Sequence, residues 1–243
     1  MTAGLVRHTV ARAIVAFVLL ATAGATRAQL GGSVSLQSDY RFRGLSLSDE
    51  KPSARLTLSL DDASGWYAGA SVAGVRAEGE RRAQLLLYGG RAARLGNGLT
   101  WDAGATGVHV AGSADTDYAE LYAGLVGDRW TARVHFSPEY YGRSERTLYA
   151  EANAAQPLTS RWRLFGHAGA LVRLDGAGPA GGRQVRADVR AGVAAGVDAW
   201  DVQLAWVAVQ SDNSAGYYGY GYGSGSSAAR DRSAVVLGVS FAF

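Results

Sequence analysis

Apolar residues alternate with small or polar residues along most of this chain. The clearest case is residues 232–243, where Val235, Leu237, Val239, Phe241 and Phe243 share one phase of the alternation. A period of two residues is that of a β-strand with two unlike faces. About ten residues in a tilted strand are enough to cross a bilayer. The pattern therefore predicts membrane-crossing strands.

Turn-forming residues divide the chain into twelve such segments. We place them near 33–43, 53–61, 66–75, 83–95, 99–109, 117–126, 130–137, 147–155, 162–173, 183–197, 200–209 and 232–243. Short turns alternate with longer polar connections, and an even number of strands puts both chain ends on the short-turn side, which we take as the periplasmic side. The expected fold is all-β: a transmembrane, antiparallel, up-and-down β-barrel of about 12 strands.

Tryptophans recur at one position in this scheme. Each of five begins a predicted strand directly after a short turn: Trp66, Trp101, Trp130, Trp162 and Trp200. Tryptophan favours the membrane–water interface, where the ring is half buried and its N–H stays hydrated. We expect an aromatic girdle on the short-turn side. In a soluble β-sandwich these five tryptophans would instead be core residues, and their shared position would then be a coincidence.

The tryptophans also set the phase of each strand. From Trp200 the outward face reads Val202, Leu204 and Trp206, while the inward face is more polar. A charged interior beside an apolar exterior is the reverse of a soluble barrel. The residues predicted to line the lumen are Asp39, Arg41, Arg43, Arg55, Asp102, Glu120, Arg133, His135, Glu151, Arg163, His167, Arg186, Asp188, Arg190 and Asp201.

Two interpretations stay open for the charges on the lumen phase of the first strand, Asp39, Arg41 and Arg43. They either line a pore or form a buried network of ion pairs that braces the barrel. Both signs of charge share the strand faces, which slightly favours bracing. Because the signs are nearly balanced, a channel of this kind would show at most a weak preference for anions.

The N-terminal segment predicts export. Arg7, His8 and Arg12 precede an apolar run over residues 13–25 that is too short to span a membrane, and small residues follow. This is the pattern of a signal peptide, residues 1–28, with cleavage after Ala28 or alternatively after Ala25, and a barrel over 29–243. Of 24 basic residues, Arg7, Arg12 and Arg27 lie in the leader, which leaves 21 against 21 acidic ones. The excess of basic residues in the whole chain therefore comes from the leader and gives no reason to expect nucleic-acid binding.

Little in the sequence points to catalysis or a cofactor. The chain has no cysteine, and His109, His135 and His167 lack the short spacing of metal ligands. His109 and Ser113 lie near the long-loop end on the lipid-facing phase, which leaves a lipid-modifying membrane enzyme as an alternative. A nucleophile needs a base and an orienting group within hydrogen-bond reach, and the sequence identifies none. We therefore expect no enzyme, metal or cofactor.

Several stretches resemble a known family. They are Ser38-Asp39-Tyr40-Arg41-Phe42-Arg43-Gly44-Leu45-Ser46, Ser64-Gly65-Trp66-Tyr67-Ala68-Gly69, Phe136-Ser137-Pro138-Glu139-Tyr140-Tyr141-Gly142 and Leu148-Tyr149-Ala150-Glu151. Together they are similar to the TorF family of porins over essentially the whole chain after the leader. The resemblance implies an outer-membrane barrel of a Gram-negative bacterium. The terminal aromatic residues Phe241 and Phe243 resemble the signal by which such barrels are recognised for assembly.

The sequence thus predicts a narrow porin, a passive diffusion channel for small solutes in the outer membrane. Its expected partners are outer-membrane lipids, lipopolysaccharide and the barrel-assembly machinery. A non-conducting structural or adhesive barrel acting through its extracellular loops is the first alternative. The longest connection, residues 210–231, is rich in tyrosine and glycine. We expect it to fold over the mouth of the barrel, which would shield its aromatic area from water.

Overall fold

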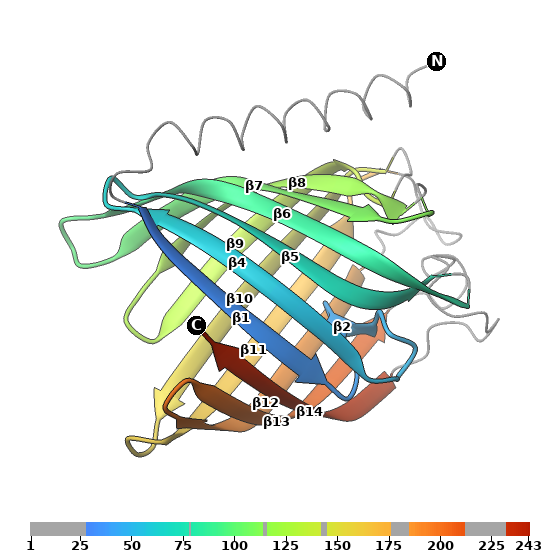
Figure 1. Ribbon diagram of the computed structural model, residues 1–243. Coiled ribbons are helices and arrows are strands. Elements are labelled where there is room, and N and C mark those ends of the chain that lie inside the picture. Colours follow the sequence, from blue (N-terminus) through green and yellow to red (C-terminus); the bar gives the residue numbers. More distant parts are fainter. Residues whose placement is uncertain (1–27, 78, 114–115, 142–144, 176–184, 212–231) are drawn as a thin grey trace.

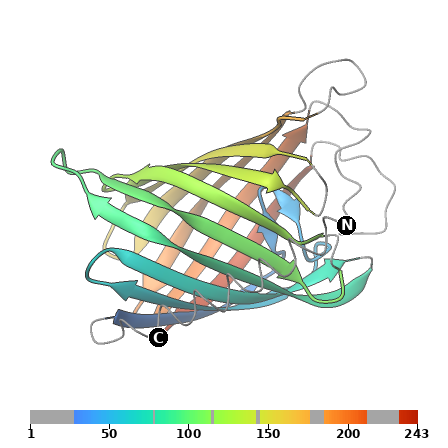
Figure 2. The ribbon, with the colours of Figure 1, turned by 90° about the horizontal axis from the view of Figure 1, so that it is seen from above.

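The computed structural model describes residues 28–77, 79–113, 116–141, 145–175, 185–211 and 232–243. Twelve antiparallel strands form a closed barrel in which each is hydrogen-bonded to its sequence neighbours (Figures 1 and 2). This confirms the predicted twelve-stranded, up-and-down barrel. The wall strands are β1 (Ala28–Gln37), β4 (Ser53–Asp62), β5 (Trp66–Ala77), β6 (Glu80–Arg94), β7 (Thr100–Val110), β8 (Tyr118–Val126), β9 (Trp130–Glu139), β10 (Thr147–Pro157), β11 (Trp162–Arg173), β12 (Val185–Val197), β13 (Trp200–Ser211) and β14 (Arg232–Ala242).

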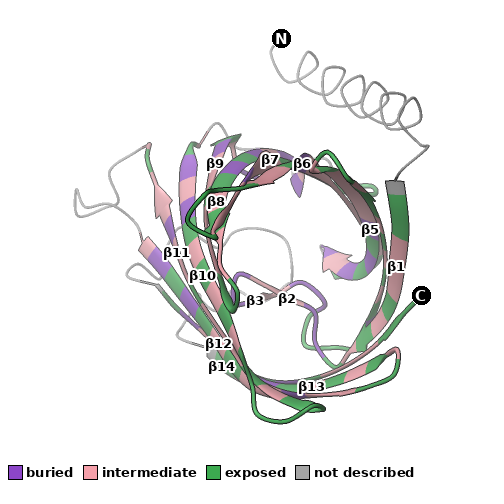
Figure 3. Ribbon diagram, turned by 90° about the vertical axis from the view of Figure 1, so that its left-hand side faces the viewer, coloured by how far each residue is buried: buried purple, intermediate pink, exposed green. Residues whose placement is uncertain are grey.

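Alternation along each strand decides which side chains face outward. In β4, Leu56, Leu58 and Leu60 are exposed, whereas Thr57 and Ser59 between them are partly covered. Figure 3 shows the resulting stripes of burial around the wall. The exposed outer face carries large apolar residues on most strands, including Val34, Val72, Leu121, Val134, Leu164, Val202, Leu204, Trp206 and Leu237.

The five tryptophans lie at the starts of their strands, and their role as an interfacial girdle stays a prediction. Trp66, Trp130, Trp162 and Trp200 are the first residues of their strands, and Trp101 is the second residue of β7. The first four are exposed, with 42–55% of their surface accessible, and Trp101 is half-buried. All five follow the short connections of the barrel.

The first and last strands close the barrel. Residues 33–37 of β1 pair with 238–242 of β14. The pairing continues beyond β14, because Gly32 and Phe243 exchange two backbone hydrogen bonds of 2.9 Å. A Cβ on Gly32 would lie 2.6 Å from the Phe243 ring, so glycine is required for the ring to lie there. The terminal phenylalanine is therefore part of the closing seam.

The predicted first strand is wrong in its position. Residues 33–43 were expected to form it, but β1 ends at Gln37 and the chain then turns into the lumen (Figure 3). There residues 41–46 form a small hairpin of β2 (Arg41–Phe42) and β3 (Leu45–Ser46). The Asp39 carboxylate accepts hydrogen bonds from the hydroxyls of Ser46 and Ser48, at 2.5 and 3.1 Å, and these bonds hold the two arms of the segment together. Asp39, Arg41 and Arg43 thus belong to the lumen but not to the wall.

Two predicted features lie outside the described residues. The leader up to residue 27 is one, and most of the loop expected to cover the mouth, residues 212–231, is the other. Within the described ranges, the model holds no helix long and apolar enough to cross a membrane.

Candidate functional site

An inward hairpin, residues 38–52, is the first element of the candidate site. Its two-residue turn has positive φ at both positions, 49° at Arg43 and 78° at Gly44, which is the type I′ geometry that suits a tight hairpin. A Cβ on Gly44 would come within 2.8 Å of the Cβ atoms of Asp188 and Val209. The tip therefore touches β12 and β13, the third and second strands from β1 around the barrel.

A buried ion pair holds the hairpin to the wall. The Arg43 guanidinium donates to both carboxylate oxygens of Glu120 on β8, at 2.8 and 2.6 Å, and both side chains are 3% exposed. The guanidinium also lies 4.0 Å from the ring centroid of Tyr149 and donates to the Tyr140 hydroxyl at 3.3 Å. A left-handed backbone costs a non-glycine residue about 1–2 kcal/mol. These contacts of Arg43 offset that cost.

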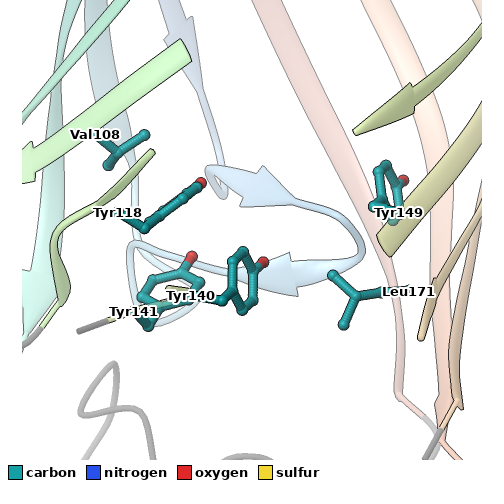
Figure 4. Close-up of a cluster of buried hydrophobic side chains, with 6 residues drawn as sticks. All are labelled: Val108, Tyr118, Tyr140, Tyr141, Tyr149 and Leu171. Atoms are coloured by element: carbon teal, nitrogen blue, oxygen red, sulfur yellow. The ribbon is translucent and has the colours of Figure 1, made fainter. Parts of the chain in front are cut away.

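Aromatic and aliphatic side chains fill the lumen around the hairpin. The tyrosine cluster consists of Val108, Tyr118, Tyr140, Tyr141, Tyr149 and Leu171, and Phe42 of the hairpin packs against it. Figure 4 shows the hairpin running between members of this cluster. A second group joins Tyr40 and Leu47 to inward residues near the end of β5 and to Val110. Since these residues lie near the long-loop ends of their strands, that half of the lumen has a packed core.

Acidic and imidazole side chains alternate along five neighbouring strands. Glu120 on β8 lies 3.6 Å from His135 on β9, and His135 lies 3.5 Å from Glu151 on β10. His167 on β11 lies 4.0 Å from Glu151 and 2.9 Å from Asp188 on β12. The acid–imidazole row, Glu120 to Asp188, connects the Arg43 ion pair to the open part of the lumen.

A cavity of about 680 Å³ occupies the lumen between the hairpin and the short-turn rim. Hairpin residues, including Asp39, Arg41 and Arg43, form one boundary, and turn residues 127–129 form another. The polar and charged side chains that line its wall are Gln37, Thr131, Tyr149, Glu151, Asn153, Arg163, His167, Asp188, Arg190 and Gln203. Of the fifteen residues predicted to line the lumen, the structure brings eight to this cavity: Asp39, Arg41, Arg43, Glu151, Arg163, His167, Asp188 and Arg190.

The other predicted lumen residues lie elsewhere inside the barrel. Arg133 on β9 and Asp102 on β7 form an ion pair at 2.6 Å, and Asp102 also accepts a hydrogen bond from Tyr67. Glu120 and His135 belong to the acid–imidazole row, Arg186 is buried, and Arg55 stacks 4.2 Å from the Tyr40 ring centroid. Arg163 pairs with Asp201 at 2.6 Å. Such pairs fit the bracing interpretation, and their effect on conduction stays a prediction.

Sequence reasoning missed the hairpin and the role of its serines. The Arg43-Gly44 dipeptide between Phe42 and Leu45 has the form of a tight hairpin turn, although Asn-Gly and Asp-Gly are the usual signals. Tyr140 and Tyr141 were assigned to a surface loop. In the structure Tyr140 is fully buried and Tyr141 nearly so.

His109 is on the outside of the barrel. Its Nδ1 lies 2.8 Å from an Asp117 carboxylate oxygen, and the His109 side chain is 56% exposed. Ser113 is buried, and no hydrogen bond joins it to His109 in the part of the chain that the structure describes. Within the same residues, no group of three or more histidine and acidic side chains is arranged to hold a metal ion.

Known structures with similar folds are outer-membrane channels. A structure described as the KdgM porin shares 10% identity over 89% of this chain and 99% of its own, with a TM-score of 0.51. The NanC porin shares 11% identity over 88% and 99%, with a TM-score of 0.55. An outer-membrane channel from Pseudomonas putida F1 shares 11% identity over 89% and 95%, with a TM-score of 0.52. At this identity, the likeness shows the fold alone.

Sequence comparison gives a family without a function. No curated protein matches this chain significantly. A model of a family described as "Bacterial protein of unknown function (Gcw_chp)" matches residues 21–241. With that match over nearly its whole length, the barrel described above belongs to the Gcw_chp family of bacterial proteins.

Proposed function

We propose that this protein is an outer-membrane porin, in which small solutes diffuse through a lumen narrowed by the inward hairpin. The carrying observation is the polar cavity of about 680 Å³ inside a closed barrel, between the hairpin and the short-turn rim. The TorF resemblance and the fold shared with outer-membrane channels support the same assignment.

The outer surface supports a place in a membrane. Soluble monomers rarely expose contiguous apolar patches larger than a few hundred Å². Here leucines and valines face outward on most strands, and tryptophans lie at the starts of the strands that follow the short turns. We assign the surface to outer-membrane lipids including lipopolysaccharide, the short-turn rim to the periplasm, and residues 1–28 to an export signal.

Conductance in a planar lipid bilayer tests the channel. The purified protein should give discrete current steps, and a variant with residues 40–49 replaced by a short glycine-serine linker should give larger ones. The matched control keeps the hairpin and carries Arg91→Gln, a charge change on the outer wall. Absence of steps from both the wild-type protein and the linker variant, each shown to be folded, would contradict the proposal.

The packed core at the long-loop end favours a second candidate. The hairpin and the tyrosine cluster fill that half of the lumen, as a closed barrel with a structural or adhesive role through its outer loops would require. In that case the wild-type protein conducts nothing and only the linker variant does. That result would support the closed barrel and contradict the porin proposal.

A further inference from the structure

The cavity in the lumen is lined by charges of both signs, and most of them are already paired. Its carboxylates are Asp39, Asp128, Glu151 and Asp188. Asp39 pairs with Arg41 at 2.6 Å, and Asp188 accepts a hydrogen bond from the Tyr149 hydroxyl at 3.1 Å. Asp128 belongs to the turn at the short-turn rim. The carboxylate on β10 is the exception.

Glu151 faces the cavity without a firm partner. Among the described residues its nearest basic groups are imidazoles, His135 at 3.5 Å and His167 at 4.0 Å. Both distances are longer than the usual N–H···O hydrogen bond of about 2.9 Å. An imidazole also carries a charge only when it is protonated. Glu151 therefore has an acceptor group free for a cation in the cavity.

Arg190 is the corresponding exception among the cavity arginines. Arg43 and Arg163 each pair with a carboxylate at 2.6 Å, but Arg190 has none within ion-pair distance in the described part of the chain. Its Nη2 atom donates to the Oε1 atom of Gln203 at 3.0 Å, a neutral acceptor. Guanidinium groups bind carboxylates through paired N–H donors in a fixed geometry. Arg190 therefore offers a binding group for a carboxylate.

The two residues lie on either side of His167. Arg190 on β12 is the direct partner of His167 on β11 in register, and Glu151 on β10 lies 4.0 Å from the same imidazole. Neighbouring strands are about 4.8 Å apart, which puts β10 and β12 about 10 Å apart across β11. Glu151 and Arg190 form no ion pair with each other in the structure. A solute that carries both an ammonium and a carboxylate can join them.

Apolar surface adjoins Arg190. Its register partner on β13 is Val207, which forms a buried cluster with Ala205 and Val236, and Phe165 packs against that cluster. The Arg190 guanidinium lies 5.0 Å from the centroid of the Phe165 ring. Phe165, Val207 and Val236 line the same cavity. An aliphatic group beside a carboxylate bound to Arg190 would thus have apolar contacts.

We propose that the lumen wall from Glu151 to Arg190 binds a small zwitterion of the amino-acid class, with its ammonium on Glu151 and its carboxylate on Arg190. The cavity of about 680 Å³ lies within the range of small-molecule sites, about 300–1,000 Å³. The inference deepens the porin proposal and rests on it, because it names a class of solute for the lumen. A solute with one charge leaves the opposite side chain without a partner.

Calorimetric titration of the purified, detergent-solubilised protein tests the site without requiring a current. The probe is L-leucine. Its matched controls are 4-methylpentanoate, which lacks the ammonium, and 3-methylbutylamine, which lacks the carboxylate. Each control should bind about tenfold to a hundredfold more weakly than leucine, the effect of losing one charged hydrogen bond. A control that binds as tightly as leucine would overturn the two-charge site.

Two substitutions assign the binding to the named residues. Glu151→Gln should weaken leucine binding about tenfold to a hundredfold and leave 4-methylpentanoate unchanged, because that ligand has no ammonium. Arg190→Gln should weaken leucine binding to a similar extent and leave 3-methylbutylamine unchanged. Arg91→Gln, on the outer wall, should change neither leucine nor the controls. A folded Glu151→Gln or Arg190→Gln variant that binds leucine like the wild type would overturn the site.

A stability measurement gives a second readout. Leucine should raise the denaturant concentration at which the wild type unfolds, and should raise it much less for either variant, because a ligand stabilises the folded state in proportion to its binding. Heat-dependent gel mobility shows that each variant is folded. Equal stabilisation of the wild type and both variants would exclude this site as the place where leucine binds.

The outcome is distinct from that of the channel test. Leucine binding that depends on both residues, in a protein that gives no current, supports the site and refutes the porin. Current steps from a protein that does not bind leucine, or that binds it equally after both substitutions, overturn the site and leave the porin intact.

Discussion

At the scale of single residues, glycine and tyrosine pair across neighbouring strands. A Cβ on Gly69 would lie 2.3 Å from the Tyr88 ring, and Gly90 and Gly104 stand in the same relation to Tyr67 and Tyr122. In each pair the two residues are direct partners in register. Because glycine has no side chain, the inward tyrosine can lie against the neighbouring strand. This explains why Tyr67 and Tyr88 are each followed two residues later by a glycine, Gly69 and Gly90.

Gly69→Ala should therefore destabilise the barrel. The new methyl group would overlap the Tyr88 ring, which must leave its position, and overpacking of this kind costs about 1–3 kcal/mol. Urea unfolding in lipid vesicles measures the change. Gly107→Ala is the matched control, since a Cβ there meets nothing within 4 Å. If the overlap is the cause, Tyr88→Ala should remove most of the effect in the double variant.

A second prediction at this scale concerns an ion pair outside the membrane-spanning strands. Arg146 donates to Asp175 from its backbone N–H and from its guanidinium, and this lowers the pKa of the Asp175 carboxyl to about 2. A lowered pKa means that the stabilisation is present above the ordinary value near 3.9 and is lost as the pH falls toward 2. Titration of Asp175 followed by NMR checks the value. In Arg146→Gln it should return to the ordinary range, and an unchanged titration would exclude Arg146 as the cause.

At the scale of elements, the wall was predictable and the hairpin was not. The predicted and observed bounds of the strands from β4 to β14 differ by at most three residues, because a two-residue period and turn residues define them locally. In residues 38–52 the alternation continues through Tyr40 and Phe42. The chain leaves the wall there because of contacts distant in sequence, above all Arg43 with Glu120. The alternation also predicted which residues face the lumen. It could not predict which charges pair there, because that pairing depends on the closed barrel.

The Arg43–Glu120 pair should control how firmly the hairpin is held. Glu120→Gln leaves the Arg43 charge buried without its counter-charge, a change that typically costs about 3–5 kcal/mol. We expect lower stability and larger or noisier current steps in planar bilayers, because the hairpin leaves its position more often. Arg146→Gln, which breaks an exposed ion pair, is the control and should leave the current unchanged. Reduced stability with an unchanged current would mean that the hairpin does not limit conduction.

The closing seam is the second element with a direct test. Gly32→Leu would place a side chain where the Phe243 ring lies, and the two backbone bonds between these residues join the ends of the chain. The amount of heat-modifiable, folded protein in the outer membrane should fall, and deletion of Phe243 should have the same effect. Gly31→Ala is the milder control, because its nearest contact would be the Ser59 hydroxyl at 3.3 Å. Normal levels of folded protein in both seam variants would refute this role of Phe243.

At the scale of the whole molecule, the barrel has an apolar exterior and an interior divided in two. The long-loop half holds a packed core of tyrosines and aliphatic residues, whereas the other half holds the polar cavity. A polar lumen alone would not position the hairpin, and a fully packed lumen would leave no room for a solute. The structure has both features: a packed half that holds the hairpin and an open half with space for a small molecule.

The last prediction concerns the apolar exterior and tests the membrane assignment directly. Leu204 is 49% exposed near the middle of β13, between outward-facing Val202 and Trp206. An arginine on the lipid-facing side of a barrel costs about 2–4 kcal/mol at the bilayer midplane and about 0–1 kcal/mol near its edges. Leu204→Arg should therefore lower the free energy of unfolding in lipid vesicles by about 2–4 kcal/mol. Val197→Arg, at the short-turn end of β12, is the matched control because Val197 is equally exposed, at 50%, and should lose about 1 kcal/mol or less. Equal losses at the two positions would show that the exposed belt does not face a bilayer, and the porin proposal would fall with it.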